Sequence, residues 1–178
     1  MIQETLIDPP RTAMAVFKMM PEGTLAEVIE NQFYMSPAPN PFHQRLSMRL
    51  SSYIFTYVEA HALGEVFHAP TDLFLDEHSN AVQPDIFFFS PKSNVVVDIE
   101  GVHGSPDLII EILSSGNKNH DLKTKKDLYE KFGVREYWVI DPENKLAKGF
   151  ELKQNEFQSL GSFKGQVKSA LLKTVFKF

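Results

Sequence analysis

A strand–helix–strand pattern between residues 107 and 141 constrains the fold of this chain more than any other feature. Residues 108–113 form a mostly apolar, strand-like run, a helical pattern begins near Asp121, and residues 137–140 form a second apolar run. Two strands joined by a crossover helix lie parallel in one sheet, and the connection is right-handed in nearly all cases. The sequence therefore predicts two parallel strands, with the helix packed across one face of their sheet.

The rest of the chain supplies a helix before this unit and short strands on both sides of it. Asn40 and Pro41 are typical of a helix start, and the apolar stripe that follows them ends at Gly64. Further strands are expected within residues 26–35, 65–69, 72–75 and 85–89, and from residue 146 onward. The order αβββαβ predicts an α/β fold in which one mixed β-sheet is flanked by helices.

Size and composition indicate one domain. With 178 residues and 43% hydrophobic content, the chain can bury one sizeable core, so we expect a single domain over residues 1–178 with an N-terminal arm at residues 1–22. The chain has no cysteine, which excludes disulfides and thiolate zinc sites. Neither a signal-peptide pattern nor an apolar run long enough to span a membrane is present, so we expect a cytoplasmic protein with no membrane partner.

The charge balance limits the ways in which the chain could bind nucleic acid. A formal charge of −5 and a pI near 5.7 argue against a broad basic surface that coats nucleic acid nonspecifically. This acidic balance remains compatible with a site made of carboxylates, because a cation bound there would neutralise their charge. Phosphates could still meet a local group of lysines, namely Lys118, Lys123, Lys126 and Lys131.

Lys125 stands where the helical pattern asks for an apolar residue. It falls within the stripe formed by Leu122, Tyr129 and Phe132. Burying an unpaired ammonium costs several kcal/mol, so an anionic partner is expected. In the preceding strand, alternation places Asp107 and Glu111 on one face. Two interpretations remain open: Lys125 and these acids form a metal-dependent hydrolytic site, or the lysine only snorkels from the edge of the stripe.

Several motifs follow one another in the order found in a known family. They are Gln83-Pro-Asp85, then Pro106-Asp107-Leu-Ile-Ile-Glu111, then Asp121, Lys125 and Tyr129, and last Gly133-Val-Arg-Glu136-Tyr-Trp-Val-Ile-Asp-Pro142. On this ordered set the chain resembles the Uma-two-like branch of the PD-(D/E)XK nuclease superfamily. The resemblance implies a restriction-endonuclease-like core and a metal-dependent phosphodiesterase.

The resemblance also implies roles for individual residues. Asp85 and Glu111 match the two acids that hold Mg²⁺ or Mn²⁺, and Asp107 would be either a further metal ligand or a partner of Lys125. The superfamily lysine normally stands two residues after the second acid, where this chain has Leu113. Lys125, on the following helix, matches the relocated lysine of this branch. The catalytic set implied by the resemblance is therefore Asp85, Glu111 and Lys125.

Four further residues are accessory candidates, namely Glu27, His43, Asp121 and Tyr129. His43 matches a histidine that recurs near the start of the family's first helix, although a histidine in a first helical turn is more often solvated or satisfied locally. The chain also departs from the family at two positions. Glu30-Asn31 replaces the Asp-Gly of the N-terminal hairpin, and Ser115 replaces the proline after Ser114.

The function expected from this reasoning is metal-dependent DNA hydrolysis without an organic cofactor. DNA is the expected partner, and RNA or branched DNA stays open as a substrate. The alternative is a catalytically inactive nuclease fold that serves as a DNA-binding or oligomerisation module, and the missing in-strand lysine is its best argument. Trp138 and the phenylalanines at 87–89 indicate core or subunit contact, and a homodimer is the expected assembly.

Overall fold

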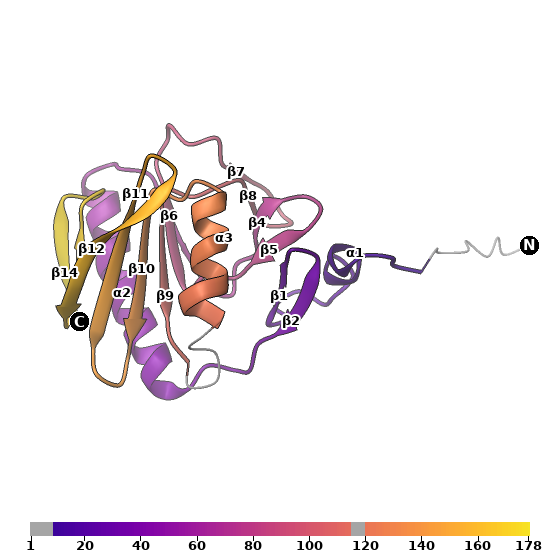
Figure 1. The fold of residues 1–178 in the computed structure, drawn as a ribbon, viewed down its shortest axis with the longest axis horizontal. Helices are drawn as coiled ribbons and strands as arrows, with labels where there is room; N and C mark the ends of the chain where they lie inside the picture. Colours follow the sequence, from indigo (N-terminus) through magenta and orange to yellow (C-terminus); the bar gives the residue numbers. More distant parts are fainter. Residues whose placement is uncertain (1–8, 115–119) are drawn as a thin grey trace, which may run out of the picture.

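The computed structural model describes residues 9–114 and 120–178, except for the side chains of residues 120–122. Its centre is a six-stranded sheet with the strand order β12-β11-β10-β9-β6-β3 (Figure 1). β9 and β10 are parallel, with Glu111 opposite Val139, and the other pairs of this sheet are antiparallel. The parallel pair predicted from the sequence is confirmed. The strands are β3 (Glu65–His68), β6 (Ile86–Phe89), β9 (Leu108–Ile112), β10 (Glu136–Asp141), β11 (Leu146–Lys153) and β12 (Glu156–Lys164).

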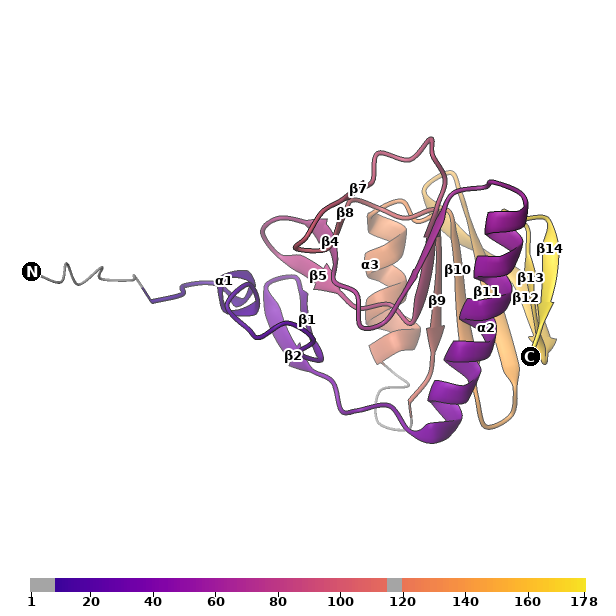
Figure 2. The ribbon, with the colours of Figure 1, turned by 180° about the vertical axis from the view of Figure 1, so that it is seen from behind.

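Helices cover the two faces of this sheet (Figures 1 and 2). On one face, α2 (Pro41–Ala60) buries an apolar stripe against β6, β9 and β10, and Asn40 caps its first turn as predicted. On the other face, the π-helix η1 (His120–Lys125) continues into α3 (Lys126–Lys131). The helix expected from Asp121 is thus present, and its first turns have the wider π geometry, which often marks functional sites.

A second six-stranded sheet lies beside the first, with the order β2-β1-β5-β4-β8-β7. Where one mixed sheet was expected, the described residues form two mixed sheets and a separate two-stranded hairpin near the C-terminal end of the chain. These strands are only two to four residues long, and β1 pairs with the distant β5, so local sequence patterns do not reveal which sheet they join. The strands are β1 (Ala26–Ile29), β2 (Gln32–Met35), β4 (Leu73–Asp76), β5 (Asn80–Val82), β7 (Val96–Val97) and β8 (Val102–His103).

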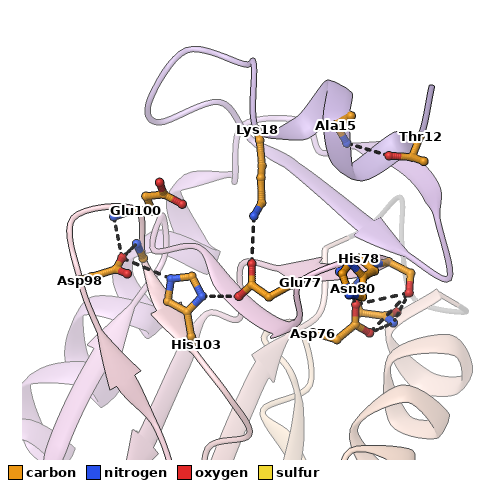
Figure 3. Close-up of polar contacts among 12 residues, drawn as sticks. Thr12, Ala15, Lys18, Asp76, Glu77, His78, Asn80, Asp98, Glu100 and His103 are labelled. Atoms are coloured by element: carbon orange, nitrogen blue, oxygen red, sulfur yellow. Dashed lines mark hydrogen bonds and ion pairs between the residues drawn. The ribbon is translucent and has the colours of Figure 1, made fainter. Parts of the chain in front are cut away.

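The described part of the N-terminal arm is tied to this second sheet. The arm carries α1 (Ala13–Phe17), and Lys18 Nζ after it lies 2.9 Å from Glu77 Oε2. Glu77 Oε1 lies 2.7 Å from His103 Nδ1, and Asp98 Oδ1 lies 3.2 Å from the other ring nitrogen (Figure 3). An imidazole with a carboxylate at each nitrogen can donate to both only when it is protonated. Lys18 of the arm is therefore joined to the second sheet by a network of charged side chains.

A hairpin near the end of the chain packs beside α2, and a tryptophan of the central sheet is buried against it. The strands β13 (Gln166–Ser169) and β14 (Thr174–Lys177) pair with each other and pack near α2. Trp138 is fully buried, and its indole N–H donates to Glu136 Oε1 at 2.7 Å. Gly149 on β11 faces the ring so closely that an added Cβ would lie 2.5 Å from it.

No helix in the described parts of the chain is long and apolar enough to cross a membrane.

Candidate active site

Two of the predicted acids come from neighbouring antiparallel strands. Ile86 of β6 stands opposite Ile110 of β9, and continuing this antiparallel register by one residue would set Asp85, just before β6, opposite Glu111. Directly opposed residues point to the same face of a sheet. The main-chain N–H of Ile112 donates to Asp85 Oδ2 at 2.7 Å and fixes this carboxylate at the end of β9. The strand pairing therefore brings Asp85 and Glu111 to one end of the central sheet.

Lys125 bridges two carboxylates that come from different sheets. Its Nζ lies 2.7 Å from Glu27 Oε1 on β1 and 3.1 Å from Glu111 Oε1 on β9. The lysine is only 5% exposed, and both glutamates are buried. An ammonium at this depth is not snorkelling toward water, so the structure decides against that interpretation. Lys125 instead ties the second sheet to the central sheet through a buried ion cluster.

Tyr129 adds a hydroxyl to the same cluster. It lies one turn after Lys125, is fully buried, and its hydroxyl donates to Glu111 Oε1 at 2.6 Å. Burial raises the pKa of Tyr129 well above its ordinary value, and the charges of Glu111 and Glu27 raise it further. The hydroxyl therefore stays protonated and acts as a donor to the carboxylate. Glu111 is held by two donors from one helix, which fixes its rotamer.

His43 approaches the site from α2, on the far side of Asp85. Its Nε2 lies 3.2 Å from Asp85 Oδ2, and the side chain is buried. Burial lowers the pKa of His43, but the hydrogen bond and charge of Asp85 outweigh that effect, with help from the Ile112 carbonyl and Glu111. The net result is a raised pKa. His43 is thus a buried partner of Asp85 and not a solvated histidine, and this contact is compatible both with a locally satisfied residue and with an accessory role.

These groups line one cavity of about 330 Å³. It lies between the start of α2, the end of β9 and strand β1. The residue just before β6 and the last residue of η1 also line it. The charged and titratable side chains in its wall are Glu27, His43, Asp85, Glu111 and Lys125, and the polar ones include Gln44, Ser47, Gln83 and Ser114. The structure therefore collects five of the eight sequence-derived site candidates around one hollow, and Tyr129 joins them from behind Glu111.

Asp107 makes its contacts away from this cavity. Its Oδ1 accepts from Arg135 at 3.0 Å, and its Oδ2 accepts from the main-chain N–H of Ser90 at 2.7 Å. Asp107 shares a strand face with Glu111 as expected, but four residues along a strand amount to about 13 Å. The described contacts of Lys125 are with Glu27 and Glu111. The remaining candidate, Asp121, has a side chain outside the described residues.

The donor set suits a hard divalent cation held by few protein ligands. Within the described residues, no three His, Asp or Glu side chains converge closely enough to form a complete metal cage. Mg²⁺ usually binds through one or two carboxylates and completes its shell with waters and substrate phosphates. Asp85 and Glu111 both line the cavity and offer carboxylate oxygens of this kind. The residues present therefore fit Mg²⁺ or Mn²⁺.

The contacts that link Glu27 and Gln83 to the site were not predicted from the sequence. Glu27 Oε1 accepts from Lys125 and from the main-chain N–H of Gln83 at 2.9 Å. The Gln83 side chain in turn donates to Asp72 Oδ1 at 2.7 Å. The signal for Glu27 was its place in the first strand as a lone acid in an apolar run, while the signal for Gln83 was its position two residues before Asp85.

Comparisons with known proteins bear on the family and the fold of the chain. The model of the Uma2 family, described as "Putative restriction endonuclease", matches residues 14–175. The fold is similar to that of a putative nuclease belonging to DUF820 from Anabaena variabilis ATCC 29413, with a TM-score of 0.68 and 22% identity. That similarity covers 84% of this chain and 84% of the other.

A weaker likeness extends to the type IIG restriction endonuclease BpuSI, with a TM-score of 0.41 and 8% identity over 69% of this chain and 14% of that one. No curated protein matches the sequence. The family match covers nearly the whole chain, and the DUF820 structure shares its fold.

Proposed function

Since this chain belongs to the Uma2 family, we propose that it is a metal-dependent endonuclease that hydrolyses phosphodiester bonds in DNA. The observation that carries the proposal is the convergence of Asp85, Glu111 and Lys125 on one cavity, in the motif order of the family. Two acids beside a buried ammonium are the groups that such a hydrolysis requires. The proposal treats residues 1–178 as one catalytic domain.

Asp85 and Glu111 would hold the cation, together with the carbonyl of Ile112. The bound Mg²⁺ or Mn²⁺ would supply a Lewis acid that neutralises charge on the phosphate. The carboxylates need little reorganisation to take this role, because Ile112 N–H and Tyr129 already fix their positions. Preorganised groups of this kind stabilise a transition state without a reorganisation cost at the moment of reaction.

Lys125 would orient the attacking water and stabilise the charge that grows on the phosphoryl oxygens. Its ammonium is already desolvated and aligned between Glu27 and Glu111, so it can turn toward a third oxygen with little further loss of hydration. Glu27 would position Lys125, and His43 would position Asp85. Both act through a catalytic group and are assigned as positioning residues.

The rival proposal is an inactive nuclease fold that only binds DNA or assembles subunits. Leu113 occupies the place of the usual in-strand lysine, and it is buried in the core cluster that includes Leu128 and Tyr129. Leu113 therefore packs in the core and supplies no charge to the site. The lysine on the helix lies in contact with the second acid, which favours the catalytic proposal over the rival one.

The test is cleavage by the purified protein across a set of nucleic acids. Supercoiled plasmid, linear duplex DNA, single-stranded DNA and RNA are incubated with Mg²⁺, Mn²⁺ or a chelator. We expect DNA to be cut with either ion and left intact with the chelator. If the folded protein binds DNA but cuts none of these substrates with either ion, the inactive module is the better account. Cleavage of RNA alone would assign a different substrate.

A further inference from the structure

Up to Val58, the outward face of α2 carries no acidic residue, although the protein as a whole is acidic. The chain has 23 Asp and Glu residues among 178, yet residues 41–58 contain none and include Arg45 and Arg49. Both arginines are exposed. They stand four residues apart, which places them about 6 Å apart along the helix axis on the same side. This side of the molecule therefore carries a local positive charge.

The same helix exposes large apolar side chains. Phe42 is 71% exposed, Met48 is 71% exposed and Phe55 is 53% exposed. Phe42 and Met48 line one groove together with the two arginines, whereas Phe55 lines a second groove on the other flank of the helix, which Met48 also borders. Figure 2 shows α2 lying in front of the sheet, and no other element crosses it on the near side. Single exposed apolar residues are ordinary, but a group of them beside charged residues marks an interaction surface.

Two grooves run along the flanks of this helix. One, of about 740 Å³, is lined by Phe42, Arg45, Arg49 and Lys145 among others, and it lies on the side of the β10–β11 turn. The other, of about 710 Å³, lies between α2 and β3 and includes Ser52, Phe55 and Thr71. None of the described residues that line either groove is Asp or Glu. The first groove therefore suits an anionic partner, and the second, which has no described Lys or Arg in its wall, offers apolar and aromatic surface that would not repel one.

The second groove is continuous with the candidate active site. Four residues line both the groove and the site cavity, namely Gln44, Ser47, Ala69 and Pro70. The start of α2 also carries His43, which contacts Asp85. A polymer whose phosphate lies beside Asp85 and Glu111 could therefore continue along α2 without leaving the protein surface.

We propose that the outer face of α2, with its two flanking grooves, binds a DNA segment with unpaired bases next to the phosphate that is cleaved. Arg45 and Arg49 contact successive phosphates, and the rings of Phe42 and Phe55 stack on exposed bases. Arginines interleaved with aromatic rings are how proteins hold single strands, because every base has a face that can stack. A fully paired duplex presents no free base faces to these rings. The inference rests on the proposed function and names its substrate more closely.

A second copy of this chain fits the same face less well. In a two-fold dimer the same patch meets itself, so Arg45 and Arg49 of one copy would lie against those of the other. The face has no carboxylate to compensate them, since the first acid on the helix is Glu59 at its far end. Like charges brought together in an interface cost several kcal/mol. Charge complementarity therefore favours DNA.

Binding measured without metal tests this inference separately from cleavage. Fluorescence anisotropy of a labelled single strand of about 20 nucleotides, and of its duplex, is followed with chelator present over a range of salt concentrations. The variants are Arg45→Gln/Arg49→Gln and Phe55→Ser, which alter exposed side chains only. The matched control is Lys92→Gln/Lys148→Gln, which removes the same charge at exposed sites outside the grooves.

We expect the wild type to bind the single strand more tightly than the duplex. The arginine pair should weaken this binding about 10-fold or more and reduce the salt slope by about 1.4, the value for two phosphate contacts on a single strand. Phe55→Ser should weaken it about 5-fold or more with the slope unchanged. Equal weakening by the lysine control, or preference for the duplex, would overturn the inference.

Three further results separate this inference from its rivals. If the wild type is a dimer that Phe55→Ser converts to a monomer while DNA binding stays intact, the face is a subunit interface and the inference fails. If strand binding is lost as expected in the variants but the wild type cuts nothing, the inference stands and the proposed nuclease activity fails. If cleavage occurs and its KM is unchanged in the arginine variant, the activity stands and the inference fails.

Discussion

Replacing Lys125 with methionine removes the charge at the centre of the site and keeps most of the length of the side chain. In the structure this ammonium contacts Glu27 at 2.7 Å and Glu111 at 3.1 Å, and all three side chains are buried. Removing one member of a buried ion cluster typically costs about 3–5 kcal/mol, because the remaining charges lose their compensation. For a chain of this size each kcal/mol lowers Tm by about 2–4 °C. We therefore expect Lys125→Met to melt about 6–20 °C below the wild type without metal.

Lys126→Met is the matched control one position along the helix. The Lys126 ammonium lies over the rings of Phe150 and Phe157, at 5.1 Å and 5.6 Å from their centroids. Cation–π contacts that are not deeply buried contribute about 0.5–1 kcal/mol, so this variant should melt within a few degrees of the wild type. Tm is measured by calorimetry on both variants, without metal and with Mn²⁺. Mn²⁺ should raise Tm more in Lys125→Met than in the wild type, because the cation replaces the lost charge between the carboxylates.

The same pair of variants tests the catalytic role of Lys125. Loss of a group that stabilises charge in the transition state typically lowers kcat about 10²–10³-fold. We expect a loss in this range for Lys125→Met, measured as initial rates of DNA cleavage at a temperature where both variants are folded. The reasoning is refuted if Lys125→Met melts within a degree or two of the wild type, or if Lys126→Met loses as much activity as Lys125→Met.

Three smaller predictions follow from other contacts. Glu27→Gln should lower kcat about 10-fold with KM nearly unchanged, because it keeps an acceptor for Gln83 but weakens the hold on Lys125; an unchanged kcat would contradict its positioning role. Burial lowers the pKa of His103, but Glu77 and Asp98 outweigh it, so the net pKa is raised. Its stabilising effect is then complete below the ordinary pKa of 6.5 and is lost as pH rises through the folded value. The Tm difference between wild type and His103→Gln should therefore be larger near about pH 6 than near about pH 9, and an equal gap would contradict this network (Figure 3). Gly149→Ala should destabilise by about 1–3 kcal/mol in urea unfolding, because its Cβ would overlap the Trp138 ring; no change would mean that the ring can move aside.

The parts of the fold with strong local patterns were predictable from the sequence. The apolar runs of β9 and β10 and the helical stripe between them fixed the parallel pair, because strand and helix periods differ clearly over such lengths. The start of α2 followed from Asn40 and Pro41. The second sheet was not predictable, because its strands are short and their pairing depends on contacts between distant segments.

The candidate site was predictable in its residues but less so in its geometry. Alternation correctly placed Asp107 and Glu111 on one strand face, but it says nothing about distance along the strand, and Asp107 contacts Arg135 instead. The partner of Lys125 was expected from the cost of a buried charge, and Glu111 was named correctly. Glu27 could not be assigned as the second partner, since it is 98 residues away in the chain and belongs to the other sheet.

Initial rates of DNA cleavage in Asp85→Asn and Asp107→Asn, measured against Mg²⁺ concentration, test the central claim most directly. Both changes remove one carboxylate charge, but Asp85 lines the site cavity and Asp107 contacts Arg135 and Ser90 elsewhere. Wild type should show a rate that rises with Mg²⁺ and saturates. Asp85→Asn should lose about 10²-fold or more, as expected when a group that holds the catalytic ion is removed, and Asp107→Asn should keep most of the rate once it is folded. Cleavage that persists in Asp85→Asn, or that proceeds without a divalent ion, would contradict the account.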